Sequence, residues 1–281
     1  MSGSLGYLTS LFSGTFGGGD TLLNTLYGTG SSSSGSTSPV QALRSAEVNQ
    51  ARDVKLTAAQ PTVQHTIAAF TKAVTGAKSV AQLLANPAVM KVLLTANGMG
   101  DQIGNTAIVT KVLTSNLSDP KSLANTLTDS RWKTLAHTYD FAANGLKPIQ
   151  DPKTLATIAN GYAQVTWRHT QDTVTPGLSN ALAFKAKAST ISSVDQILGD
   201  PVMRDVVTTA LGVPKQIAFQ TLGAQEQAIS TRIDLKKFQD PKFVEGFVQR
   251  YLIANAANGT DTSSSTPDLM TLAVQSRGNF A

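Results

Sequence analysis

Apolar residues recur through the middle of the chain at spacings of three and four positions. Three sets show this spacing most clearly: Val63, Ile67, Phe70 and Val74; Leu155, Ile158, Tyr162 and Val165; and Phe243, Phe247 and Tyr251. Such a spacing places apolar side chains on one face of an α-helix. No run of alternating Val, Ile and Thr bounded by turn residues stands out, so we predict an all-α fold.

The central part of the chain contains an internal sequence repeat. Shifting the sequence by 114 positions brings Ser79 onto Ser193 and Ile103 onto Ile217, and it gives eleven identities within 25 positions. With small gaps, the match extends to Asp129–Trp132 and Asp240–Phe243. We therefore predict two tandemly duplicated helical units, a first unit at residues 40–148 and a second unit at residues 149–257.

Both ends of the chain are rich in Gly, Ser and Thr. Residues 1–39 carry two short apolar islands, and we expect them to be disordered unless Leu5, Leu8, Leu22 and Leu23 contact a partner. Residues 258–281 form a Ser/Thr-rich linker and then a short amphipathic piece with Leu269, Leu272 and Val274. We expect this piece to form a short docking helix in a flexible tail.

An acidic or amide residue followed by proline occurs repeatedly. Such a residue can cap a helix, because its side chain accepts hydrogen bonds from the free amides of the first turn and proline suits the next position. This pattern predicts helix starts at Asn86-Pro87, Asp119-Pro120, Asp151-Pro152, Asp200-Pro201 and Asp240-Pro241, with Thr175-Pro176 as a sixth. A ligand site is the alternative, but it would require these side chains to converge.

Composition excludes several classes of function. The chain has no cysteine, so it holds neither disulfides nor thiolate metal clusters. Its net charge of +5 comes from scattered basic residues, which argues against nucleic-acid binding. No window approaches the roughly 20 apolar residues of a membrane-spanning helix. The N-terminus lacks the basic start of a cleaved signal peptide, so we expect either a cytoplasmic protein or export without such a signal.

Three motifs raise the question of an active site. Ser118 and Lys121 spell S-x-x-K, but no partner motif follows, and Asp119-Pro120 already has a structural explanation. The segment from Gly98 to Asn105 lacks phosphate-loop spacing, and Asn97, Asp101 and Asn105 are a weak calcium candidate without a bidentate Glu. We interpret Gly98 and Gly212 as helix C-terminal glycines. Isolated histidines complete no metal pair, so we predict no enzyme, cofactor or metal.

Charged and aromatic residues recur near the end of each unit. Arg131 follows Asp129 as Lys242 follows Asp240, and Trp132 aligns with Phe243. A capped, solvated helix start explains the charges, and packing explains the aromatic rings. The alternative hypothesis is that these four residues, Arg131, Trp132, Lys242 and Phe243, form an interaction site used once per unit.

The chain resembles family 1217 of the domains of unknown function, helical proteins of alphaproteobacteria that are often encoded among flagellar genes. The resemblance rests on "SVAQLLANPAVMKVLLTANGMGDQIG", its copy "SVDQILGDPVMRDVVTTALGVPKQIAF", and the segments "LTDSRWKTLAHTYDF" and "FQDPKFVEGFVQRY". It covers about residues 40 to 257, and it implies a flagellum-associated role without any catalytic residue.

Three functional hypotheses follow from these observations. The first is a non-enzymatic structural or interaction protein of the flagellum that is exported and contacts its neighbours through the apolar terminal islands. The second is a cytosolic helper or regulator that binds an exported helix in a groove between the units. The third is an enzyme acting at the segment from Gly98 to Asn105, which requires a deep polar pocket near Asp101.

Overall fold

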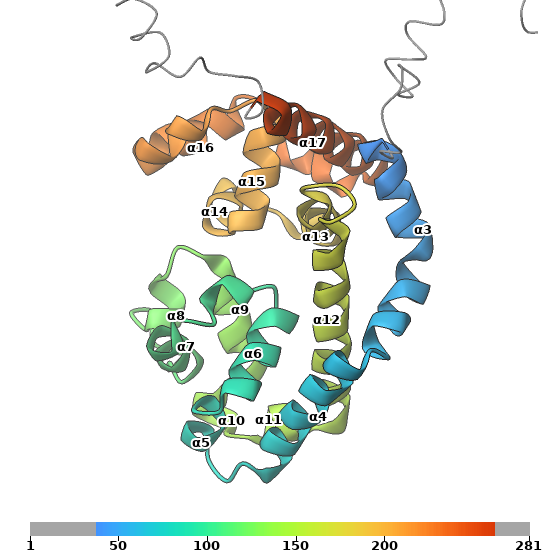
Figure 1. The fold of residues 1–281 in the computed structure, drawn as a ribbon. Helices are drawn as coiled ribbons and strands as arrows, with labels where there is room; N and C mark the ends of the chain where they lie inside the picture. The colour runs from blue at the N-terminus through green and yellow to red at the C-terminus, as the bar shows by residue number, and fades with distance from the viewer. Residues whose placement is uncertain (1–37, 262–281) are drawn as a thin grey trace, which may run out of the picture.

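The computed structural model describes residues 38–261, with side chains for residues 38–258, and this part of the chain consists of helices joined by turns and loops (Figure 1). The first half contains α3 (Pro39–Ala58), α4 (Pro61–Gly76), α5 (Val80–Leu84), α6 (Pro87–Ala96), η1 (Gly100–Gln102), α7 (Thr106–Leu113), α8 (Leu123–Thr126), α9 (Ser130–Tyr139), α10 (Phe141–Asn144) and α11 (Lys147–Gln150).

The second half contains α12 (Pro152–Gln171), α13 (Leu178–Lys187), η2 (Ala188–Thr190), α14 (Val194–Gly199), α15 (Pro201–Ala210), η3 (Lys215–Phe219), α16 (Leu222–Ser230), η4 (Leu235–Gln239) and α17 (Pro241–Asp261). No strand occurs within residues 38–261, which confirms the predicted all-α fold. No helix in this range is long and apolar enough to cross a membrane. The predicted contact residues Leu5, Leu8, Leu22 and Leu23 lie outside the described residues, as does the predicted docking piece of the tail.

Four of the six predicted proline-marked helix starts are confirmed. Asn86 and Asp200 each accept hydrogen bonds from two backbone amides at the starts of α6 and α15. Asp151 accepts one from the amide of Thr154 in α12, and Asp240 accepts one from the amide of Lys242 in α17. Each side chain satisfies donors that a helix leaves free, and such a cap contributes about 1 kcal/mol to stability.

The other two predicted starts are wrong. Asp119 lies in a β-turn, where its carbonyl accepts the amide of Ser122 and its carboxylate accepts the amide of Lys121. Thr175 precedes a turn through Gly177, whose φ of 85° lies in the left-handed region that favours glycine. Helix α13 begins after this turn, at Leu178. Proline preceded by a polar residue suits the first positions of a turn as well as those of a helix, so the local motif alone did not separate the two outcomes.

The order of helices repeats along the chain. The succession α3, α4, α5, α6, η1 and α7 is matched by α12, α13, α14, α15, η3 and α16, and Gly98 and Gly212 end α6 and α15 with positive φ, as predicted. Beyond α7 the register differs from our alignment. Gln150 donates to the carbonyl oxygens of Val74 and Ala77 at the end of α4, and Gln239 donates to that of Ser189 after α13.

These two glutamines therefore correspond to each other, and each precedes the sequence Asp-Pro-Lys of a long helix, α12 or α17. Asp240 thus has Asp151 as its structural counterpart, whereas our alignment paired it with Asp129. The difference arises because the first unit contains three additional helices, α8, α9 and α10, between α7 and α11. The duplication itself remains a prediction.

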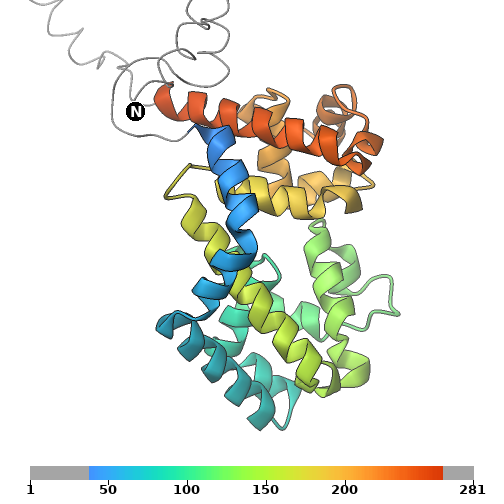
Figure 2. The ribbon, with the colours of Figure 1, turned by 90° about the vertical axis from the view of Figure 1, so that its right-hand side faces the viewer.

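The apolar core consists of two clusters, and each takes helices from both predicted units. The first cluster lies among α4 to α11 and includes Ile158, Tyr162 and Ala163 from the first turns of α12. The second lies among α13 to α17 and includes Leu43 of α3 together with Trp167 near the end of α12. The boundary between the cores therefore falls within α12 and not between residues 148 and 149. Helices α3 and α12 pack on each other and connect the two parts of the molecule (Figures 1 and 2).

Candidate functional site

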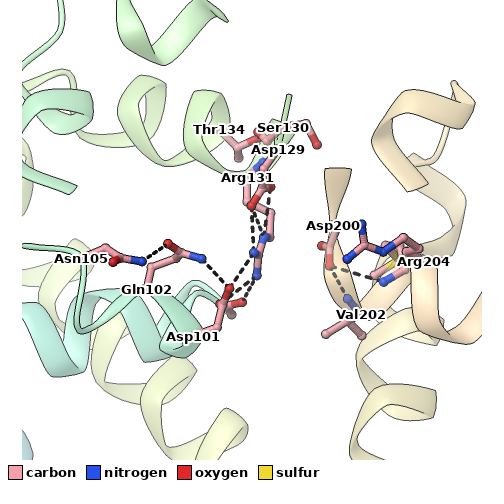
Figure 3. A network of polar contacts seen from close by, with 12 residues as sticks. Asp101, Gln102, Asn105, Asp129, Ser130, Arg131, Thr134, Asp200, Val202 and Arg204 are labelled. Carbon is pink, nitrogen blue, oxygen red and sulfur yellow. Dashed lines mark hydrogen bonds and ion pairs between the residues drawn. The ribbon is translucent and has the colours of Figure 1, made fainter. Parts of the chain in front are cut away.

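A polar cleft lies between the two predicted units, and we call it the interunit cleft. It consists of a hollow of about 540 Å³ and an adjoining one of about 390 Å³, and the two share Asn97, Arg131, Thr134, Lys187, Asp200 and Met203. The end of α6, η1 and α9 form one wall, α13 and the start of α15 form the other, and α12 joins them. Figure 3 shows Arg131 and its partners facing Asp200 across the cleft.

The first wall is organised by Arg131, which is only 8% exposed. Its Nη2 lies 2.8 Å from Asp129 Oδ2 and 3.1 Å from Asp101 Oδ2, and its Nη1 donates to the Gly98 carbonyl at 2.8 Å. Burial alone would lower the pKa of Arg131, but its hydrogen bonds and proximity to both carboxylates raise that pKa well above its ordinary value. Arg131 is thus a fixed cation that ties α9 to η1.

The opposite wall is organised by Asp200, which is 5% exposed. Its Oδ1 accepts hydrogen bonds from the amides of Val202 at 2.9 Å and Met203 at 3.3 Å. Its Oδ2 lies 3.8 Å from Nζ of Lys187, which extends into the cleft from the end of α13. The Asp200 carboxylate is therefore already occupied by a helix cap and a cation.

One edge of the cleft is held by a backbone contact between the units. A Cβ added to Gly199, at the end of α14, would lie 2.5 Å from the carbonyl oxygen of Thr128 and 3.0 Å from Cα of Asp129. Both atoms belong to the segment that leads into α9. Only glycine allows this approach, so the sequence at Gly199 sets the separation of the walls.

Gly199→Ala is expected to lower the free energy of unfolding by about 2 kcal/mol, because backbone atoms must move to accept the methyl group. Urea unfolding monitored by circular dichroism measures this change. Gly223→Ala in α16 is the matched control, since a Cβ there meets no atom within 4 Å and alanine favours a helix. Equal stability of the two variants would contradict the close approach.

The structure separates the four residues that we considered as a repeated interaction site. Arg131 and Trp132 are buried in the first unit, whereas Lys242 is exposed at the start of α17. Phe243 packs against the rings of Phe238 and Phe247 at the edge of the second core. The packing interpretation of the two aromatic residues agrees with these positions, and the solvated interpretation of Arg131 is wrong because two carboxylates surround it.

The segment from Gly98 to Asn105 does border a pocket, as the enzyme hypothesis required, but its polar groups are engaged elsewhere. Asp101 binds Arg131 and Gln102, Asn105 donates to Gln102, and Asn97 donates to Leu93 and Tyr139. Burial would raise the pKa of Asp101, yet the hydrogen bond from Arg131 holds it below its usual range. Within the described residues, no three His, Asp or Glu side chains gather as metal ligands.

The sequence did not single out the residues of α12 and α13 that line the cleft. Gln164, Arg168, Asn180 and Lys187 all reach it. Their only local signal is that Arg168 follows the buried Trp167 on the helix, and nothing in the sequence shows what lies opposite. The cleft is formed by tertiary packing of distant segments.

These features define a class: an all-α protein whose two parts share long connecting helices and enclose a polar cleft. A family model described as a protein of unknown function, DUF1217, matches residues 96–244. The chain therefore belongs to the DUF1217 family. It is also similar to the crystal structure of protein AGR_C_984 from Agrobacterium tumefaciens, with 25% identity, a TM-score of 0.66, and coverage of 80% of this chain and 96% of that one. No curated protein matches the chain.

Proposed function

We propose that this chain is a non-enzymatic helical structural protein associated with the bacterial flagellum, and that copies of it assemble through a groove on the second unit. The flagellar part of the proposal is supported by the family resemblance. The assembly part is supported by one observation: Phe219, at the end of η3, is 89% exposed beside a groove of about 690 Å³. A large apolar side chain in this position is typical of a contact surface.

The groove is built from α15, η3 and α16 on the outer side of the second unit. Val213, Ile217 and Ile229 contribute apolar surface to it, and Leu222 lies exposed close to Phe219 in sequence. Arg204 and Lys215 add positive charge to the lining, whereas the carboxylate of Asp205, which also lines the groove, accepts hydrogen bonds from Asn180 and Tyr251. An occupant that suits this lining has a few apolar side chains with an acidic residue beside them.

The C-terminal segment of the chain has this composition. Asp268 is followed by Leu269, Met270 and Leu272, and Asn258 near the end of α17 already lines the groove. The last residues of α17 that the structure describes therefore lie close to the groove. We infer that residues 268–274 of one copy occupy the groove of a neighbouring copy. Because the groove and the segment are different surfaces, this contact is head-to-tail, and repeating it generates a closed ring or an open filament.

The test is the concentration dependence of molar mass, measured by light scattering after size-exclusion chromatography. The wild-type chain is expected to associate, and Phe219→Asp or Leu272→Asp is expected to abolish association. Val174→Asp is the matched control, because Val174 is 59% exposed and does not line the groove. A monomer at all concentrations would overturn assembly through this groove and favour the helper alternative, in which the chain binds an exported helix between its two units.

The flagellar association is tested separately by immunoblotting of sheared filaments and of cytosol from motile cells. Presence in the filament fraction, lost on deletion of residues 1–39, is expected for an exported component. Strict retention in the cytosol would contradict export and favour an assembly helper.

A further inference from the structure

Arg168 of α12 reaches the interunit cleft, and no acceptor for its charge lies among the residues that the structure describes. Its Nε atom is buried and has no hydrogen-bond partner, and the guanidinium forms no ion pair within the described residues. Arg131, in the same cleft, has two carboxylates and a carbonyl oxygen around it. Within residues 38–258, acceptors therefore surround only one of these two cations, Arg131.

The nearby carboxylates are already engaged. Asp172, one turn further along α12, accepts hydrogen bonds from the amide and the hydroxyl of Ser179. Asp205 accepts from Asn180 and from the hydroxyl of Tyr251. Asp101 pairs with Arg131, and Asp200 caps α15 and lies near Lys187. None of them pairs with Arg168, so the described residues supply no counter-anion to it.

Arg168 is half-buried, and its Nε atom has no acceptor among the described residues. Burial lowers the pKa of Arg168, which shows that the charged form is desolvated without compensation. An arginine in this position suits a binding site, because a ligand carboxylate supplies the missing hydrogen bonds in a two-pronged geometry.

We propose that the interunit cleft binds a carboxylate ligand, with Arg168 as its anchor. Gln164, Thr134 and Asn180 supply neutral hydrogen-bonding groups in the same hollow, and Lys187, which lies 3.8 Å from Asp200, also lines it. Asp101 and Asp200 line the same hollow, so they repel a multiply charged phosphate and favour a single carboxylate on an otherwise neutral body. The volume of about 540 Å³ admits a small organic acid or one acidic side chain of a peptide.

This site is separate from the groove beside Phe219, so it extends the proposed function without depending on it. Thermal-shift and calorimetric titrations of the full chain test it with two kinds of probe. One arm uses free acids, namely propionate, lactate and succinate, each against its amide. The other arm uses a short alanine peptide containing one glutamate, against the same peptide with glutamine. The arm that binds identifies the source of the carboxylate.

A carboxylate probe is expected to raise the melting temperature of the wild-type chain, whereas its amide analogue leaves it unchanged. Arg168→Met is expected to weaken binding by about tenfold or more, the effect of losing a hydrogen bond to a charged group. Arg204→Met is the matched control, because Arg204 lines the outer groove and not the hollow around Arg168. An equal shift in Arg168→Met and wild type would mean adventitious binding, and no shift with any probe would overturn the proposal.

Stability without ligand separates a binding role from a structural one. If Arg168 serves a ligand, Arg168→Met and Arg168→Gln are expected to melt at the same or a higher temperature than the wild type, because an uncompensated charge has been removed. If Arg168 instead pairs with Asp172 in solution, both variants melt lower or fail to fold. That result would overturn the assignment of Arg168 as a ligand anchor.

Discussion

Arg131→Met is expected to lower the free energy of unfolding by about 3 kcal/mol, since it leaves two carboxylates without their buried cation. This loss lies at the lower end of the roughly 3–5 kcal/mol that breaking a buried ion pair costs. The reason is that the Asp101 side chain is 43% exposed, so water solvates its carboxylate once Arg131 is gone. The larger part of the loss comes from Asp129, whose side chain is 16% exposed and also caps α9. Urea unfolding at neutral pH, monitored by circular dichroism, measures the change.

Lys242→Met is the control for this substitution. Lys242 also follows a capping aspartate by two residues, but its side chain is exposed and forms no ion pair in the described residues. Its replacement is expected to change stability by less than about 0.5 kcal/mol. Comparable losses in the two variants would contradict the structural difference between them.

Lowering the pH should reduce the difference in the free energy of unfolding between Arg131→Met and the wild type. The folded-state pKa of Asp101 lies below its ordinary value of 3.8, so the stability that its ionisation contributes is complete above that value. It is lost as pH falls through the lower, folded-state pKa. In Arg131→Met the hydrogen bond that lowers this pKa is absent. Unfolding at about pH 3 is therefore expected to show a smaller difference between the two proteins than at neutral pH.

The sequence predicted features that depend on neighbouring residues. The caps at Asn86, Asp151, Asp200 and Asp240 form because each side chain reaches amides two or three positions ahead, and this geometry is specified locally. The all-α fold follows for the same reason from the spacing of apolar residues. Asp119 shows the limit, because a turn and a helix start share the same first residues.

The candidate cleft was not predictable, since it depends on which surfaces meet. Arg168 and Asp101 are 67 positions apart, and only the packing of α12 on α6 brings both to one hollow. An amphipathic pattern shows that a helix buries one face but not which helix covers it. For that reason the sequence did not predict that α3 of the first unit packs into the second core, or that α12 of the second unit packs into the first.

The two predicted units, residues 40–148 and 149–257, are expected not to fold when they are produced separately. The first fragment lacks Ile158, Tyr162 and Ala163 of α12, and the second lacks Leu43 of α3, which is fully buried in its core. Losing Leu43 alone corresponds to about 3 kcal/mol. A domain of this size has only about 5–15 kcal/mol of stability to lose, and each fragment also exposes the apolar faces that its missing helix covered.

Fragments whose ends follow the two apolar clusters, and not the predicted unit boundary, are expected to fold. A fragment of residues 59–171 keeps every fully buried member of the first cluster and is expected to melt cooperatively by circular dichroism, unlike residues 40–148. For the second unit, adding a peptide of residues 38–58 to residues 149–258 should return Leu43 to its site and change the fluorescence of Trp167, which belongs to the same cluster. Cooperative melting of both original fragments would show that each core closes without the exchanged helix, because helices α3 and α12 would then contribute only peripheral contacts.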